Sequence, residues 1–171
     1  FLKKLDQGLQ AGIRLFQWRE PGWPGGPDNT DLHQALKTVI ARCHAAGAQV
    51  LVNSIHPEAW WHEADGVHLR THDAATLSSR PDLAKGKRVG VSTHTLAELA
   101  HARALEADFA VLGPVLPTAS HPGHPGIGWE AFAELNAQAG LPVFALGGQS
   151  AATLAQAQSV GGHGFAGIRG W

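Results

Sequence analysis

Hydrophobic residues along this chain gather in short runs that are separated by longer stretches with helical spacing. The short runs are rich in Val, Leu and Phe and end in Gly, Pro or hydroxyl-bearing residues, a pattern typical of buried parallel strands. The pattern predicts strands at residues 13–19, 49–53, 66–69, 88–92, 108–112, 142–146 and 164–168.

The stretches between these runs repeat their apolar positions at helical intervals. Leu2, Leu5 and Leu9 share one face of a predicted helix at the start of the chain, and Thr30 or Asp31 is expected to cap the second helix. Gly47 is a typical stop after that second helix. Helices are predicted at residues 1–11, 30–46, 57–63, 74–79, 96–106, 129–139 and 150–160.

Strands that alternate with helices predict an α/β fold with a parallel sheet. Seven strands behind a leading helix are one strand short of a (β/α)8 TIM barrel, so the first strand is expected upstream of residue 1 or is missing. The alternative is a doubly wound open sheet, which would have its own Gly-rich turn after the first strand. That turn is absent, and the barrel is therefore favoured.

Length and composition describe an ordinary globular domain. The 171 residues suit one domain, 44% are hydrophobic and 16% charged, and the net charge of −1 gives no reason to expect nucleic acid or a membrane surface as partner. No run reaches the ~20 apolar residues of a membrane-spanning helix. The lone Cys43 suits a reducing cytoplasm and a buried apolar position. The start at Phe1 and the lack of Met predict a fragment of a longer chain.

Polar residues collect at the ends of the predicted strands, where barrels place their chemistry. The long loop from residue 113 to 128 is of a length that is usually functional. The set is rich in hydrogen-bond donors and positive charge, which favours an anionic ligand. Its members are Gln17, Arg19, Asn53, His68, Arg70, Ser92, Thr93, Thr118 and His121.

A phosphate site is predicted where Gly147 and Gly148 end the penultimate strand, with Ser150 as the cap of the next helix and with Gly167 and Arg169 beside them. A tight turn with an ordinary cap is the alternative. On the first strand, Gln17 and Arg19 alternate with Phe16 and Trp18, so the two polar side chains share one face. They hold either a ligand or a structural hydrogen-bond network.

Metal ligands are less clearly indicated. His62, His68 and His72 do not follow a zinc spacing, and a cysteine pair is absent. Asp73 follows a strand end and is a candidate Mg²⁺ ligand, and the alternative is that it caps the following helix.

At these residues the chain resembles thiamine-phosphate synthase and the related thiazole tautomerases. The resemblance covers nearly the whole chain in order, through LFQWRE, VLVN, ADGVHLRTHD, RVGVSTHTLAEL, DFAVLGPVLPT, PVFALGG and GFAGI. It implies a (β/α)8 barrel whose first strand precedes the helix with which this chain begins.

The resemblance also implies a reaction in which a pyrimidine diphosphate loses pyrophosphate and a thiazole phosphate captures the pyrimidine. Gln17, Arg19 and Asn53 would hold the pyrimidine and its diphosphate, and Asp73 would bind Mg²⁺. The remaining implied contacts are Ser92 and Thr118 to the diphosphate, and Gly147, Gly148, Gly167 and Ile168 to the thiazole phosphate.

The chain departs from the family pattern at the charged positions. Pro21 and His121 stand where the family has lysines, and Ser54 replaces a second Mg²⁺-binding aspartate, which weakens the expected metal site. Each lost charge of this type commonly lowers the rate about 10²-fold or more. Arg70, in place of a family glycine, is expected to compensate in part. Arg19 and His121 are the catalytic candidates, the latter as a general acid or base, with a plain loop histidine as the alternative.

Degenerate barrels of this kind resemble those fused behind a Nudix domain that hydrolyses oxidised nucleotides, and the ending GIRGW is similar to theirs. Three interpretations stay open: a weakened synthase or tautomerase, a non-catalytic module that senses thiamine-type phosphates for an attached Nudix hydrolase, and a structural appendage that aids folding or homodimerisation.

Overall fold

The computed structural model describes residues 2–119 and 123–168, and the chain forms two compact units. Unit 1 consists of Phe1–Arg70 and Pro81–Val89, and unit 2 of Thr71–Arg80 and Gly90–Trp171. Within the described ranges, no helix has both the length and the apolar character needed to cross a lipid bilayer.

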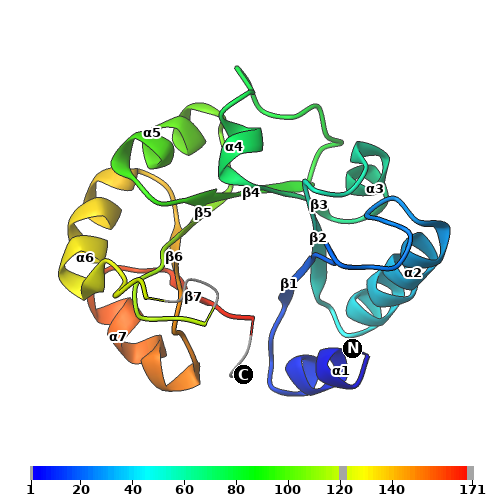
Figure 1. The fold of residues 1–171 in the computed structure, drawn as a ribbon, viewed down its shortest axis with the longest axis horizontal. Helices are drawn as coiled ribbons and strands as arrows, with labels where there is room; N and C mark the ends of the chain where they lie inside the picture. The colour runs from blue at the N-terminus through cyan, green and yellow to red at the C-terminus, as the bar shows by residue number, and fades with distance from the viewer. Residues whose placement is uncertain (1, 120–122, 169–171) are drawn as a thin grey trace. The chain divides into compact units, whose positions relative to one another are not determined.

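Unit 1 contains three parallel strands with helices before and between them (Figure 1). The strands β1, β2 and β3 pair in chain order, with Trp18 opposite Val52 and Asn53 opposite His68. The elements are α1 (Leu2–Gln10), β1 (Leu15–Trp18), α2 (Thr30–Ala45), β2 (Gln49–Asn53), α3 (Glu58–Glu63) and β3 (Gly66–Leu69).

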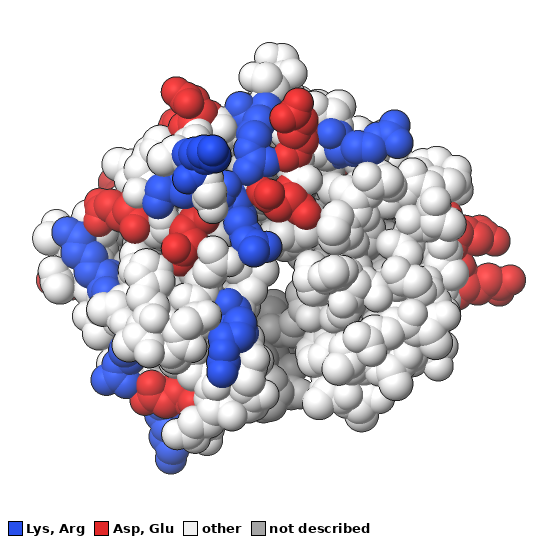
Figure 2. All heavy atoms as spheres, turned by 180° about the vertical axis from the view of Figure 1, so that it is seen from behind, with Lys and Arg blue, Asp and Glu red and all other residues white. Residues whose placement is uncertain are grey.

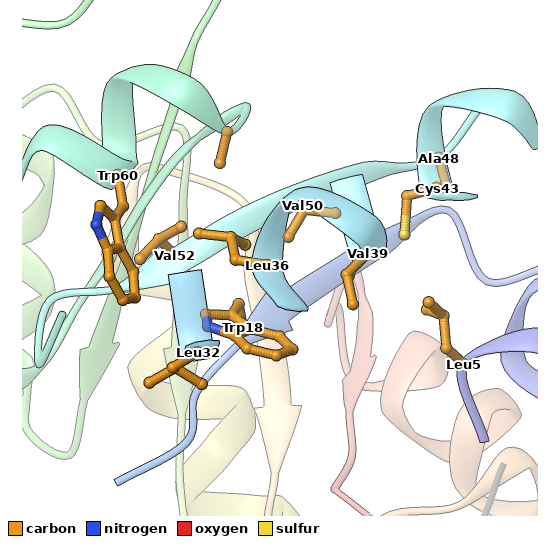
Figure 3. Packing of buried hydrophobic residues seen from close by; sticks show 11 residues of the cluster. Leu5, Trp18, Leu32, Leu36, Val39, Cys43, Ala48, Val50, Val52 and Trp60 are labelled. Carbon is orange, nitrogen blue, oxygen red and sulfur yellow. The ribbon is translucent and has the colours of Figure 1, made fainter. Parts of the chain in front are cut away.

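The core of unit 1 lies between α2 and one face of its strands (Figure 3). Leu32 and Leu36 of α2 are fully buried and pack against Trp18, Val50 and Val52. Burying one such leucine contributes about 1.5–3 kcal/mol. Since side chains alternate along a strand, the neighbours of these residues on β1 and β2 point to the opposite face.

Cys43 belongs to the same core and has no disulfide partner. Burial, with a smaller effect of the Asp65 carboxylate, raises the pKa of its thiol to about 11. The thiol is therefore protonated near neutral pH and serves as a packing group, which confirms the prediction of a buried apolar role.

The cap of α2 differs from the prediction. Asn29 is the N-cap, and its Oδ1 accepts from the backbone N–H of Asp31 at 2.8 Å and of Leu32 at 3.4 Å. Thr30 is already the first helical residue. The prediction of Thr30 or Asp31 as the cap is therefore wrong, since the capping side chain is that of Asn29 and the helix already begins at Thr30.

Unit 2 contains the next four strands, again parallel and in chain order (Figure 1). Its core joins Ala110, Leu112 and Ala145 of the strands to Leu99 and Phe132 of the helices. The elements are α4 (Thr71–Ala74), β4 (Arg88–Thr93, from Gly90 on in unit 2), α5 (Leu96–Ala104), β5 (Phe109–Leu112), α6 (Gly128–Ala139), β6 (Val143–Leu146), a 3-10 turn (Ala151–Thr153), α7 (Leu154–Ser159) and β7 (Gly164–Ala166).

Two predicted helices are wrong in placement or kind. The helix predicted at residues 74–79 is the four-residue α4, which lies earlier, and Asp73 is inside it rather than capping it. The helix predicted at 150–160 is a 3-10 turn followed by the six-residue α7. The other helices and strands are confirmed in type, with ends within about two residues of the prediction.

Candidate functional site

The polar face of unit 1 brings two predicted residues into contact. Asn53, only 3% exposed, donates from Nδ2 to Gln17 Oε1 at 2.8 Å, and its own Oδ1 accepts from the Ile55 N–H at 3.1 Å. Gln17 is exposed. Because Asn53 fixes the carbonyl oxygen of the Gln17 amide, the amino group of Gln17 is oriented away from this bond and presents donors to the surroundings.

His68 lies beside Asn53 on the neighbouring strand and is 3% exposed. Burial, and then the nearby Arg19 guanidinium, lower the pKa of His68 to about 4. The imidazole is therefore neutral near pH 7 and is unsuited to donate a proton. The Arg19 guanidinium is therefore close enough to His68 for its charge to affect the ring.

Ser54 and Arg70 form the turn beyond the Asn53–His68 pair. The Arg70 N–H donates to Ser54 Oγ at 2.9 Å, and the Ser54 N–H donates to the His68 carbonyl oxygen at 3.0 Å. Ser54 thus ties two strand ends together through its backbone and hydroxyl.

In unit 2, Gly147 and Gly148 directly follow β6 and have φ values of 92° and 66°. A β-carbon at Gly147 would lie 2.6 Å from Pro114 Cβ, and one at Gly148 would lie 2.7 Å from Leu116 Cβ and 2.8 Å from the Pro117 oxygen. Both the backbone conformation and the available space therefore require glycine here. Pro114, Leu116 and Pro117 therefore pack directly against this turn.

The long loop after β5 packs onto these glycines. The Val115 N–H donates to the Leu146 oxygen at 2.7 Å, and the Leu116 N–H to the Gly147 oxygen at 3.2 Å. The far end of the loop returns to its own start, since the Gly128 N–H donates to the Val115 oxygen at 2.9 Å. This anchoring places the Pro117 oxygen 2.8 Å from where a Gly148 β-carbon would lie, and Thr118 is the next residue of the loop.

Gln149 was missed by the sequence interpretation. It is 6% exposed, donates from Nε2 to the Gly147 oxygen at 2.7 Å, and accepts at Oε1 from Thr153 Oγ1 at 2.8 Å. Ser150, at the cap position, donates its N–H to the same Thr153 oxygen at 3.1 Å. These bonds fix the glycine turn. A polar residue between a Gly-Gly pair and a cap is the signal that could have identified it.

The segment of the chain that carries this turn has no charged side chain. Residues 135–168 contain no Asp, Glu, Lys or Arg. Figure 2 accordingly shows few charged side chains on the surface over α6 and α7. Binding would rest on backbone N–H groups and hydroxyls. The β6–β7 pairing ends at Leu146 and Ala166; Gly147 follows the first of these strands, and Gly167 and the exposed Ile168 follow the second.

Ser92 and Asp73 occupy a separate part of unit 2. Thr71 Oγ1 donates to the Ser92 carbonyl oxygen at 2.9 Å. Thr71 and Ser92 line a pocket of about 220 Å³, together with Glu98 and His101. Asp73 Oδ1 lies 2.9 Å from Nε2 of the exposed His72. In the described part of the chain, no three His, Cys, Asp or Glu side chains cluster as metal ligands would.

Two predicted site residues, His121 and Arg169, lie outside the described residues. The remaining predicted residues divide between the units: Gln17, Arg19, Asn53 and Arg70 belong to unit 1, and Asp73, Ser92, Thr118, Gly147, Gly148, Gly167 and Ile168 to unit 2.

Comparison with known proteins places this chain in a family. The sequence model described as thiamine monophosphate synthase (TMP-TENI) matches residues 1–171. A thiamine-phosphate synthase of Parasynechococcus marenigrum is 35% identical over 158 residues, which cover 92% of this chain and 44% of that protein. A putative thiamine-phosphate synthase 2 of Aquifex aeolicus is 33% identical over 172 residues, covering 98% of this chain and 88% of that protein.

A solved structure shares the fold. The thiamine phosphate pyrophosphorylase of Pyrococcus furiosus matches with a TM-score of 0.76 at 22% identity, over 97% of this chain and 78% of that one. This match confirms the predicted α/β fold of the TIM-barrel type. The chain spans less than half the length of the Parasynechococcus relative. Its sequence, matched from end to end, makes it a member of the thiamine monophosphate synthase (TMP-TENI) family.

Proposed function

We propose that unit 2 binds a phosphorylated thiazole of the kind used to make thiamine phosphate. The observation that carries the proposal is the turn at Gly147 and Gly148, where neither residue has room for a β-carbon and where Gln149 fixes the backbone. Consecutive peptide N–H groups in such a turn form a concave site for an anion. The backbones of Gly167 and Ile168 complete it, and Thr118 contributes its hydroxyl.

The helix that follows contributes little to this site. The segment after Ser150 is a 3-10 turn and a six-residue helix, so its dipole is short. The proposed phosphate contacts therefore rest on the glycine turn.

Calorimetric titration of the chain with hydroxyethylthiazole phosphate tests the proposal. We expect micromolar binding, about −8 kcal/mol, and at least tenfold weaker binding by Gly148→Ala, because the new β-carbon must displace Leu116 or Pro117. The control is Gly161→Ala, since Gly161 has a similar φ of 85° but lies after the end of α7. Equal losses in both variants would contradict the assignment.

Unit 1 is proposed to hold a diphosphate-bearing pyrimidine through Gln17, Arg19, Asn53 and Arg70. The hydrogen bond that orients the Gln17 amide supports this role, as does the positive charge of Arg19 on the same face.

The residues present do not fit a complete Mg²⁺ site. Asp73 supplies one carboxylate and faces His72, whereas Ser54 offers a hydroxyl that already accepts from the Arg70 N–H. Mg²⁺ prefers several oxygen ligands in octahedral geometry. Mg²⁺ binding at Asp73 stays a prediction, and no step of the proposed function depends on it.

Transferase activity is a second candidate, favoured by the intact Gln17–Asn53 pair. The variant Pro21→Lys, Ser54→Asp, His121→Lys restores two cations and a carboxylate. We expect it to form thiamine phosphate at least about 10²-fold faster than the wild-type chain, since charges of this kind stabilise a departing pyrophosphate. The yield of thiamine phosphate per hour from both substrates is the measurement, and no gain would contradict transferase ancestry at this site.

Three finer interpretations stay predictions: thiazole tautomerase activity with His121 as acid or base, a sensing role for an attached Nudix hydrolase, and homodimerisation. Thiazole phosphate binding without any gain in the triple variant would favour the sensing role.

A further inference from the structure

His56 is a buried histidine in unit 1 to which the proposed function gives no role. It is 3% exposed, and its Nδ1 lies 2.7 Å from the Pro27 carbonyl oxygen while its Nε2 lies 3.2 Å from the Glu20 backbone nitrogen. A carbonyl oxygen only accepts and an amide N–H only donates. The two contacts therefore require a neutral ring with the proton on Nδ1 and the lone pair on Nε2.

The two backbone groups that His56 holds are the two ends of one loop. This loop leads from β1 toward α2 and consists of residues 20–27, with the sequence EPGWPGGP. Within this loop, the Gly26 N–H donates to the Trp23 carbonyl oxygen at 3.0 Å. Arg19 directly precedes the loop, so the bond at Glu20 restrains the backbone that carries the guanidinium.

Packing fixes the His56 ring. It stacks on Trp60 with ring centroids 5.4 Å apart and planes 17° apart, and Trp60 is 4% exposed. Trp60 also stacks on His33 at 4.6 Å, and Nε2 of His33 lies 2.9 Å from Glu63 Oε1. An imidazole held in this way meets its two backbone partners at a fixed distance.

The electrostatic environment also keeps the ring neutral. Burial is the largest effect and lowers the pKa of His56, and Arg19 lowers it further, against the Pro27 carbonyl and the Glu20 carboxylate, which raise it. Both bonds of the neutral tautomer are thereby maintained near pH 7.

We propose that His56 is a positioning residue that fixes the backbone at Glu20 and thereby the place of Arg19 at the end of β1. The expected effect of His56 on ligand binding rests on the proposed anion-binding role of Arg19. The two hydrogen bonds of His56 to Glu20 and Pro27 are independent of that role. A merely space-filling role would predict that any side chain of similar size serves equally well.

Three variants separate the two bonds. His56→Gln places an amide oxygen near the Nε2 position and keeps an acceptor for the Glu20 N–H, whereas His56→Asn places an amide N–H near Nδ1 and keeps only the donor to Pro27. His56→Leu removes both. Amide hydrogen exchange of Glu20, followed by NMR on the full chain, reports the bond directly.

We expect Glu20 to exchange at least about tenfold faster in the Leu and Asn variants and to be largely restored in the Gln variant. The Asp31 amide, which donates to Asn29 Oδ1 at 2.8 Å, is the internal control and should not change. Equal Glu20 exchange in the Gln and Asn variants would overturn the proposal, as would unchanged exchange in the Leu variant.

Two further readouts distinguish positioning from packing. The ¹⁵N shifts of His56 should show a protonated Nδ1 and a bare Nε2, and the opposite tautomer would overturn the proposal. Inorganic pyrophosphate should bind at least about tenfold more weakly to His56→Leu than to the wild-type chain, with rescue by His56→Gln. Failure of the wild-type chain to bind pyrophosphate would refute the anion role of Arg19, while the exchange rates still decide the role of His56.

Discussion

Alanine at position 66 is expected to destabilise the chain by about 3 kcal/mol or more, the largest effect of a single methyl group in unit 1. Gly66 has a φ of 132°, and a β-carbon there would lie 2.0 Å from the Arg88 carbonyl oxygen and 2.7 Å from its nitrogen. Both obstacles are backbone atoms, and the Arg88 N–H is already bonded to the Asp65 oxygen at 2.8 Å. The destabilisation has two sources: a backbone conformation that is unfavourable for alanine, and a clash that rotation of a side chain cannot relieve.

The midpoint of urea unfolding measures this effect. The matched control is Gly12→Ala, because Gly12 also has a positive φ of 89° but a β-carbon there would meet nothing within 4 Å. That variant should be destabilised by about 1 kcal/mol, the cost of the unfavourable backbone conformation alone. Similar losses at positions 12 and 66 would show that Arg88 moves aside at little cost.

Acid is expected to destabilise the chain through His68. Its pKa is about 4 in the folded chain and about 6.5 when unfolded, so the unfolded state binds the proton first as the pH falls. Stability is complete above pH 6.5 and is lost progressively between pH 6.5 and 4. A difference of about 2.5 units at 1.36 kcal/mol each gives a loss of about 3 kcal/mol.

Urea unfolding at a series of pH values tests this dependence. In His68→Gln the part of the slope that belongs to this group should vanish. His56, whose pKa is also lowered, adds a residual slope of the same sign. Parallel curves for wild type and His68→Gln would exclude His68 as the source.

Much of the fold could be predicted because its strands are buried apolar runs bounded by glycine or polar residues. The segments at β2 and β3 were predicted to the residue. The prediction of α4 was wrong because its position depends on a distant partner: Thr71 bonds to the carbonyl oxygen of Ser92, and no local pattern shows this. Before α7, the helical spacing of an Ala- and Gln-rich segment predicted one continuous helix, although residues 151–153 form a 3-10 turn.

The candidate site divides in the same way. The contact between Gln17 and Asn53 could be expected, because strand alternation places each on the face opposite the helices. His56 could not, since it acts through backbone groups of the distant residues Glu20 and Pro27. Gln149 bonds within its own turn, and its place between a Gly-Gly pair and a cap was a local signal that was missed. The replacement of an aspartate by Ser54 was visible in the sequence. Its bond to the Arg70 N–H required the structure.

The most direct test of the central claim is an NMR titration of the full chain with hydroxyethylthiazole phosphate. Phosphate bound by a glycine turn must shift the amide signals that contact it. If unit 2 holds the phosphate, saturable shifts are expected at Gly147, Gly148, Gly167 and Ile168, and none with the unphosphorylated thiazole alcohol. Saturable shifts elsewhere with these four amides unmoved, or no shifts at millimolar ligand, would contradict the assignment of a phosphate site to unit 2.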